Sequence, residues 1–237
     1  QKVHNIVIVD ENSELNLITG CNCIKGGIHF GVSEFYIKKG AKVSFTMIHG
    51  WKEDTLVRPR TGAIVDGRFS SYYINLREVK DLQMEPKVYL RGIANLVSVL
   101  IGKGKSKLDV GAKVLLAGGK CEVVSRAVVK DKARVIMRGK LVGKGKCRGH
   151  LECKGLVLGG YAKAIPVLRG DKDSNLTHEA SLTKVSEEEL VYLLMKGFRE
   201  DEAISLLVRG FIDVGLEGLP ESLRKSIKVI LDQASQF

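Results

Sequence analysis

The feature that most constrains this chain is an alternation of apolar and polar residues with a period of two, which recurs through the first 181 residues. It is clear in Lys42-Val43-Ser44-Phe45-Thr46-Met47-Ile48 and in Arg134-Val135-Ile136-Met137. Such a period places successive side chains on opposite faces of an extended backbone, so these segments are predicted to be short strands. Between them lie turns rich in Gly and Lys, such as Gly118-Gly119-Lys120 and Gly143-Lys144-Gly145-Lys146.

No helical pattern interrupts these strands. Parallel strands of an ordinary sheet are usually joined by long helical crossovers, so their absence argues against a parallel sheet of that kind. A sandwich, a barrel or a solenoid fits such a series of strands. Lys120-Cys121 recurs as Lys146-Cys147, 26 residues later, and a repeat of this length favours a solenoid in which stacked coils bury one another's apolar faces. We therefore expect a right-handed parallel β-helix over residues 1–181, with a Greek-key sandwich as the alternative.

After residue 181 the pattern becomes helical. Ser186 followed by Glu187-Glu188-Glu189 forms a capping box, with acidic residues at the positive end of the helix dipole. This first helix is predicted to end at Gly197, and a second helix to end near Gly210. A third is expected after Leu219-Pro220. Residues 182–237 are thus predicted to form a small α-helical segment, which either covers the last coil or presents a groove to a partner.

The positive charge of the chain is concentrated in one stretch. Residues 103–154 contain 15 Lys and Arg against 4 Asp and Glu, whereas residues 182–237 contain 7 basic and 10 acidic residues. A basic stretch can neutralise phosphates, but 103–154 has no Phe, Tyr or Trp to stack on a base. We therefore interpret it as a solvated basic face, and a nucleic-acid-binding solenoid remains an alternative function.

Composition and cysteine content narrow the class of protein. The chain has 237 residues, 44% of them hydrophobic, and no apolar run near the roughly 18 residues that a membrane span needs. Five cysteines without secretory features indicate reduced thiols, so a cytoplasmic location is expected. The chain starts at Gln1, without an initiator Met, which leaves room for residues upstream.

Several motifs near the C-terminal end resemble one known family. They are Leu176-Thr177-His178-Glu179-Ala180-Ser181, Ser186-Glu187-Glu188-Glu189-Leu190, Lys196-Gly197-Phe198 and Glu202-Ala203-Ile204-Ser205-Leu206-Leu207-Val208-Arg209-Gly210-Phe211. Together they closely resemble the C-terminal signature of the SufB/SufD family, and Trp51 and Val88-Tyr89-Leu90-Arg91-Gly92 are similar to landmarks further upstream. The resemblance implies a parallel β-helix with a helical C-terminal segment.

This resemblance also implies a function. Such proteins are scaffold subunits of the Suf machinery, on which a transient iron-sulfur cluster is assembled, and they work with the ATPase SufC. The scaffold itself is then not an enzyme, in agreement with the absence of a Walker GxxxxGK[ST] sequence. The implied partners are a SufC-type ABC ATPase, a second SufB/SufD-like subunit in a homodimer or heterodimer, and a sulfur donor. No membrane or nucleic-acid partner is expected.

Carried over residue by residue, the cluster ligands of the family fall on Cys153, His178 and Glu179, and the pattern is closer to SufB than to SufD. At two places the chain departs from the pattern. SufB proteins carry a further carboxylate where this chain has Thr177, and the Arg-Gly-x-Cys stretch associated with accepting sulfur appears here as Arg60-Thr61-Gly62-Ala63-Ile64. Docking of the ATPase is expected on the apolar side of the helical segment, at Leu190, Leu194, Ile204, Leu207 and Phe211.

Other cysteines have a simpler interpretation. Cys121 and Cys147 are one predicted coil apart, so we expect them to stack as an interior ladder of small apolar side chains. Cys21 and Cys23 share one face of a strand, and without further ligands nearby they too are assigned to packing. A solenoid enzyme with paired carboxylates is the remaining alternative function, and the few acidic residues of 103–154 argue against it.

Overall fold

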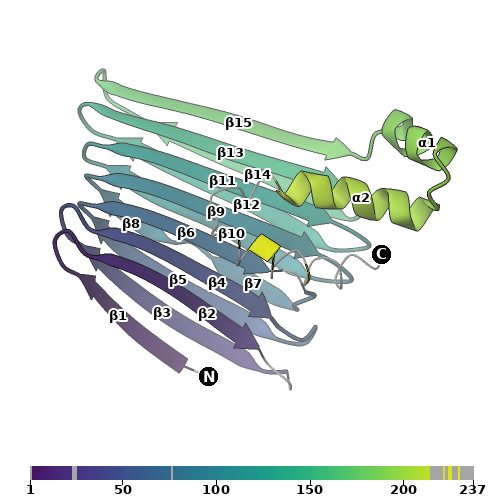
Figure 1. The fold of residues 1–237 in the computed structure, drawn as a ribbon, viewed down its shortest axis with the longest axis horizontal. Helices are drawn as coiled ribbons and strands as arrows, with labels where there is room; N and C mark the ends of the chain where they lie inside the picture. The colour runs from purple at the N-terminus through teal and green to yellow at the C-terminus, as the bar shows by residue number, and fades with distance from the viewer. Residues whose placement is uncertain are drawn as a thin grey trace.

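The chain folds into a parallel β-solenoid of about seven coils, followed by two helices (Figure 1). The computed structural model describes residues 2–22, 26–75, 77–213, 221, 224, 225 and 229. The strands are β1 (Lys2–Val9), β2 (Glu14–Asn22), β3 (Ile28–Ile37), β4 (Lys42–Gly50), β5 (Leu56–Val65), β6 (Arg68–Asn75), β7 (Asp81–Met84), β8 (Lys87–Leu90), β9 (Ile93–Gly102), β10 (Lys107–Leu116), β11 (Lys120–Val129), β12 (Arg134–Gly143), β13 (Cys147–Val157), β14 (Tyr161–Arg169) and β15 (Ser174–Lys184).

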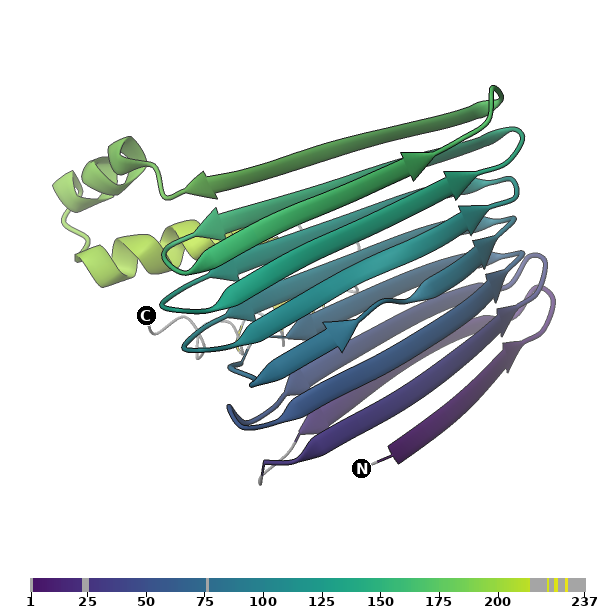
Figure 2. The same cartoon turned by 180° about the vertical axis from the view of Figure 1, so that it is seen from behind.

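Successive strands alternate between two sheets that face each other, except that β7 and β8 belong to the same sheet (Figure 2). One sheet has the order β1-β3-β5-β7-β10-β12-β14, with β8 also between β5 and β10, and the other has the order β15-β13-β11-β9-β6-β4-β2. All pairs are parallel, and residues paired between coils are 25 to 28 positions apart, as in Lys2 with Phe30 and Leu56 with Asp81. The predicted β-helix is therefore confirmed, and the sandwich alternative is wrong.

The core lies between the two sheets and is built from the inward-facing residues that the period of two predicts. Phe35, Phe45 and Phe69 are almost fully buried, with ring centroids 4.8 Å apart for Phe35 and Phe45 and 5.1 Å apart for Phe35 and Phe69. Each fully buried side chain of this size contributes about 1.5–3 kcal/mol to stability. Stacking of coils thus supplies the burial that a single coil lacks.

Glycines at the corners let the coils stack closely. Gly119 and Gly160 both have positive φ, 68° and 72°, a conformation that costs glycine little. A Cβ atom on Gly119 would collide with the carbonyl oxygen of Gly92 in the coil before, and one on Gly160 with that of Ala133. The Gly-rich turns of the sequence are therefore required both by backbone conformation and by the approach of the neighbouring coil.

The first helix is capped as the sequence motif predicts. In α1 (Glu187–Met195) the hydroxyl of Ser186 accepts a hydrogen bond of 3.3 Å from the Glu189 amide, and Gly197 follows the helix with a φ of 91°. None of the helices in the described part of the chain is long and apolar enough to cross a membrane.

Helix α2 (Glu200–Asp213) continues beyond Gly210, where its end was predicted. Its residues Val208 and Ile212 are both 1% exposed, because α2 packs on the outer face of the sheet that contains β9 and β11 (Figure 1). Burial of Ile212 outweighs the roughly 1 kcal/mol that a glycine costs inside a helix. The third predicted helix, after Leu219-Pro220, lies almost entirely outside the described residues.

Candidate functional site

The predicted ligands lie on the last two strands of one sheet. Cys153 on β13 is paired with Ala180 on β15, and Leu151 is paired with His178. Because Cys153 and Leu151 both face the core, His178 faces the same side, diagonally across from Cys153. Strand spacing and rise place their Cα atoms about 8 Å apart. Glu179 follows His178 directly, so it faces the outer side of the sheet.

Cys153 itself is fully buried, at 0% exposure. It continues an interior ladder of small polar side chains, in which Ser98 and Ser125 are paired in register and their hydroxyls are 2.9 Å apart. Burial, followed by the negative charge of Glu152, raises the pKa of the Cys153 thiol to about 11. Without a metal the side chain is therefore a neutral thiol at neutral pH.

His178 and Glu179 are exposed, because β15 is the end strand of its sheet. The inward-facing side of β15 carries Leu176, His178, Ala180 and Leu182, and no further coil covers it among the described residues. Only Ala180, with its small side chain, is stacked on Cys153 in this end coil. Within its sheet, β15 is therefore the only described strand between Cys153 and the open end of the solenoid.

The other described cysteines lie elsewhere. Cys121 and Cys147 are buried in the core as predicted, but the predicted ladder between them is wrong. Cys121 is paired with Gly149, because paired residues of β11 and β13 are 28 positions apart in the sequence. The repeated Lys-Cys dipeptides are only 26 positions apart, so the two cysteines are out of register. Burial raises the pKa of the Cys121 thiol to about 12.

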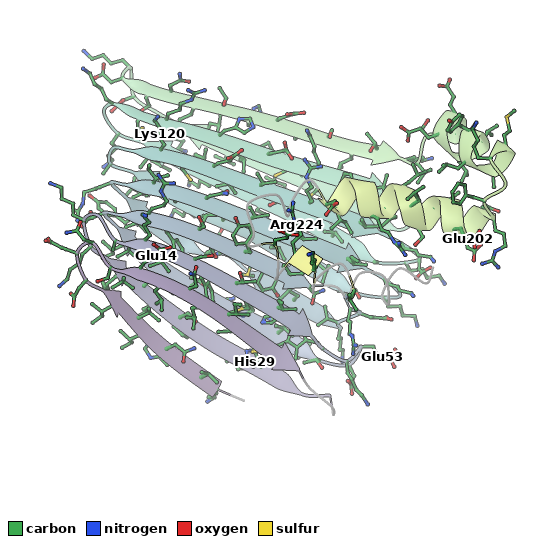
Figure 3. The ribbon with its side chains drawn as sticks, viewed as in Figure 1. Glu14, His29, Glu53, Lys120, Glu202 and Arg224 are labelled. Atoms are coloured by element: carbon green, nitrogen blue, oxygen red, sulfur yellow. The ribbon has the colours of Figure 1, made fainter. Side chains whose placement is uncertain are left out.

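Near the opposite end of the solenoid, the first coils bury a cluster of imidazoles and aromatic rings. Half-buried Cys21 is paired with His49, whereas Cys23 lies outside the described residues. His49 Nδ1 is 2.8 Å from the Tyr73 hydroxyl. His29, labelled in Figure 3, packs against Trp51 with the two rings tilted by 40° and their centroids 4.7 Å apart. Burial, with the nearby His29 charge, lowers the pKa of His49 to about 3, so this imidazole stays neutral.

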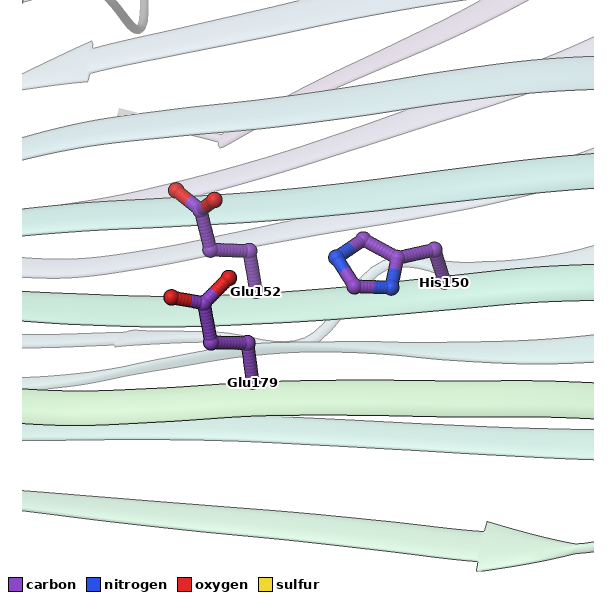
Figure 4. Close-up of side chains that lie close together, drawn as sticks. All are labelled: His150, Glu152 and Glu179. Atoms are coloured by element: carbon purple, nitrogen blue, oxygen red, sulfur yellow. The ribbon is translucent and has the colours of Figure 1, made fainter.

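On the outer face of β13 and β15, three potential ligands converge: His150, Glu152 and Glu179 (Figure 4). One ligand atom from each lies within 4.8 Å of the others. The sequence motif indicates Glu179 but neither His150 nor Glu152. The missing signal was the register, because His150 is paired with Thr177 and Glu152 with Glu179.

Ion pairs tie this outer cluster together. Lys154 Nζ is 3.2 Å from Glu152 and 3.0 Å from Glu179, so one ammonium group bridges the two carboxylates. The buried Arg126 guanidinium lies 2.7 Å from the other oxygen of Glu152. His150 Nδ1 is 2.8 Å from the Thr177 hydroxyl.

Arg126 also connects the outer cluster to the helical segment. Its second terminal nitrogen donates to the Phe211 carbonyl oxygen at 3.4 Å, and its guanidinium lies 5.4 Å from the centroid of the Phe211 ring. One buried side chain thus contacts both the end of α2 and Glu152.

The predicted docking residues divide into two groups. Ile204 and Phe211 on α2 pack against the solenoid, and Leu207 is half-buried. On α1, Leu190 is half-buried and Leu194 is 39% exposed, and no residue of this helix is buried. Of these five residues only Leu194, on α1, is exposed.

Comparisons with known proteins identify the family of this chain. Residues 1–211 match the family described as SUF system FeS cluster assembly, SufBD core domain. An iron-sulfur cluster assembly SufBD family protein of Methanothermobacter thermautotrophicus is 45% identical over 99% of this chain and 60% of that protein. One from Archaeoglobus fulgidus is 43% identical, over the whole of this chain and 67% of that protein.

A more distant relative is the iron-sulfur cluster assembly protein SufB of Bacillus subtilis, 31% identical over 91% of this chain and 50% of that protein. The chain therefore spans about half to two thirds of the length of these relatives. The match over nearly the whole chain, together with the solenoid, assigns it to a family: this chain belongs to the SufB/SufD family of iron-sulfur cluster assembly proteins.

Proposed function

We propose that this chain is a scaffold subunit of the Suf machinery, on which an iron-sulfur cluster is assembled at a subunit interface. The observation that carries the proposal is the placement of Cys153 and His178 on the same inner face, at the end of the solenoid where β15 is the last strand of its sheet and His178 is exposed. Thiolate and imidazole are established ligands of iron in clusters. Membership of the family supplies the assembly context.

One chain offers too few ligands for a cluster, which commonly has four protein ligands. Cys153 and His178 reach the inner face, and Glu179 lies at the rim of the same strand on the other side. A second copy or a related SufB/SufD-like subunit, placed over the open end, would complete the set. Sulfur for the cluster is supplied either through Cys153, which takes the outer sulfur of a donor persulfide while the donor leaves as its thiol, or directly by an outside donor.

Energy for the cycle comes, in this proposal, from a SufC-type ABC ATPase that binds the helical segment, and the scaffold catalyses no reaction of its own. The acidic first turn and the free apolar side of α1 support this docking site. We propose that cluster assembly takes place in the cytoplasm, because the described cysteines are free thiols, as in a reducing compartment.

Anaerobic reconstitution with ferrous iron and sulfide tests the cluster site. Cys153→Ala and His178→Ala should lose most bound iron and acid-labile sulfide, because each removes a ligand, and Glu179→Gln should weaken iron retention less completely. The matched control is Cys121→Ala, a buried thiol on the same inner face, which should keep the cluster while stability falls by about 1–2 kcal/mol. Equal cluster content in the wild type, Cys153→Ala and His178→Ala would refute the assignment.

A further inference from the structure

The outer cluster of His150, Glu152 and Glu179 has the donor atoms and spacing of a metal site. Its imidazole nitrogen and carboxylate oxygens converge within 4.8 Å, from two neighbouring strands of a rigid sheet (Figure 4). One imidazole with two carboxylates suits divalent first-row metals such as ferrous iron. Glu152 is only 14% exposed at its side chain, so the site is partly shielded from water.

The imidazole of His150 is oriented by a neighbour. Its Nδ1 is hydrogen-bonded to the Thr177 hydroxyl at 2.8 Å, which leaves Nε2 for a ligand. Histidines that bind metals usually have their second nitrogen held by such a partner, because this fixes the ring and its tautomer. This contact is independent of the convergence of the carboxylates, and it indicates a preorganised ligand.

A positive charge already occupies the space between the carboxylates. The Lys154 ammonium lies 3.2 Å from Glu152 Oε2 and 3.0 Å from Glu179 Oε1, so these two oxygens face the same point. Glu152 Oε1 is held separately by Arg126 at 2.7 Å, which keeps the carboxylate in place if Lys154 leaves. Lysine has a long flexible side chain, and Lys154 is 26% exposed, so its ammonium can move to solvent.

We propose that His150, Glu152 and Glu179 bind one divalent first-row metal ion on the outer face of the last coils, in place of the Lys154 ammonium. The identity of the ion as ferrous iron rests on the proposed function. The metal site itself is inferred independently of that function. Glu152 and Cys153 are consecutive on β13, so the ion would lie on the opposite face of the same strand from the thiol. The site then holds iron beside the place of cluster assembly.

Cobalt(II) is a suitable probe, because its absorption spectrum distinguishes thiolate ligands from nitrogen and oxygen ligands. Titration of the full metal-free chain should show one bound ion without a thiolate charge-transfer band, and Cys153→Ala should bind it equally well. His150→Ala and Glu152→Gln should each weaken binding at least about tenfold, and Thr177→Val, which removes only the oriented hydroxyl, by roughly 10- to 100-fold.

Two further variants distinguish a metal site from general electrostatics. Lys154→Gln should tighten cobalt binding, because the ion no longer has to displace an ammonium group. Glu122→Gln is the matched control: Glu122 is paired with His150 in the coil before and faces the same side, so it makes the same charge change outside the cluster. It should leave binding unchanged. Unaltered melting temperatures would show that the variants are folded.

Each outcome has a definite meaning. Three outcomes would overturn the outer site. The chain would bind no cobalt, or Glu122→Gln would weaken cobalt binding as much as Glu152→Gln does, or Lys154→Gln would weaken cobalt binding instead of tightening it. Binding that shows a thiolate band and disappears in Cys153→Ala would also overturn it, while the proposed scaffold function would stand. Conversely, cobalt binding as expected, together with cluster content unaffected by Cys153→Ala, would leave the outer site intact and refute the scaffold assignment.

Discussion

Adjacent residues of β15 serve opposite faces of one sheet. His178 faces the inner side with Cys153, and Glu179 faces the outer side with Glu152. A strand necessarily separates neighbours in this way, because its side chains alternate. The two adjacent residues therefore belong to different sites: His178 to the inner face with Cys153, and Glu179 to the outer cluster. Substitutions of His178 and of Glu179 should have different effects on metal binding.

At the same scale, the buried His49 makes the stability of the protein depend on pH. Its folded-state pKa of about 3 lies below the ordinary value of 6.5. Below pH 6.5 the unfolded chain takes up a proton that the folded chain does not, so stability is lost as the pH falls from 6.5 towards 3. The free energy of unfolding should fall by about 1.4 kcal/mol per pH unit from this residue, as measured by urea unfolding.

The variant His49→Gln should reduce that slope, although part remains because burial also lowers the pKa of His29. Tyr73→Phe is the control, since it removes only the hydrogen-bond partner of His49. It should cost about 1 kcal/mol at every pH and keep the slope. Identical slopes in the wild type and His49→Gln would show that another group causes the acid sensitivity.

The sequence predicts whether each site residue faces inward or outward. It does not predict which residues of the adjacent strands lie beside it. Alternation alone separates His178 from Glu179 and assigns Cys121 to the core. Register depends on how many residues each corner holds, and the coils vary between 25 and 28 residues. For this reason the Cys121–Cys147 ladder was wrong and His150 and Glu152 were missed.

At the scale of elements, local signals were more reliable than distant ones. Ser186 caps α1 through its own hydroxyl, an interaction within one turn that a sequence motif specifies completely. The end of α2 depends instead on Ile212, which is buried against strands more than 80 residues earlier in the chain, such as β11. Such tertiary contacts override the preference of Gly210 for a helix end.

Helix α1 carries the docking prediction. Leu194→Glu should weaken binding of a SufC-type ATPase at least about tenfold, because a charge would enter an apolar contact at a cost above about 1.4 kcal/mol. Ile8→Glu, at an exposed apolar position on β1, is the matched control and should bind normally. Binding constants from calorimetry would decide, and undiminished binding by Leu194→Glu would exclude α1 as the docking surface.

A point substitution is a sharper test here than removal of the whole helical segment. Val208 and Ile212 of α2 belong to one buried cluster with Ile74, Val99 and Val128 on the outer face of the sheet. Deletion of residues 186–237 would expose that apolar surface and could reduce binding through aggregation alone. Leu194 lies on a helix without buried residues, so its replacement leaves the solenoid intact.

For the whole molecule, the open end at β15 predicts association. Leu182 is 43% exposed on the inward-facing side of this strand, next to Gly155 of the coil before. Unpaired strand edges and uncovered apolar residues favour a second subunit over this end. Sedimentation at micromolar concentration should show a dimer, and Leu182→Lys should shift it to monomer.

Leu206→Lys is the control for that experiment, because Leu206 is equally exposed, at 45%, but lies on α2. It should leave the dimer unchanged. A wild-type chain that stays monomeric and still loads a full cluster would contradict the interface, as would a dimer that survives Leu182→Lys.

The stacking of coils has a consequence for how changes at the two ends combine. In the solenoid each coil packs on the coils directly before and after it, so stability is approximately a sum of nearest-neighbour interactions, as in a one-dimensional array. His49 on β4 and Cys153 on β13 lie in coils that share no contact of this kind. Their substitutions should therefore be additive, and the N-terminal coils can loosen in acid while the coils that carry the ligands keep their arrangement.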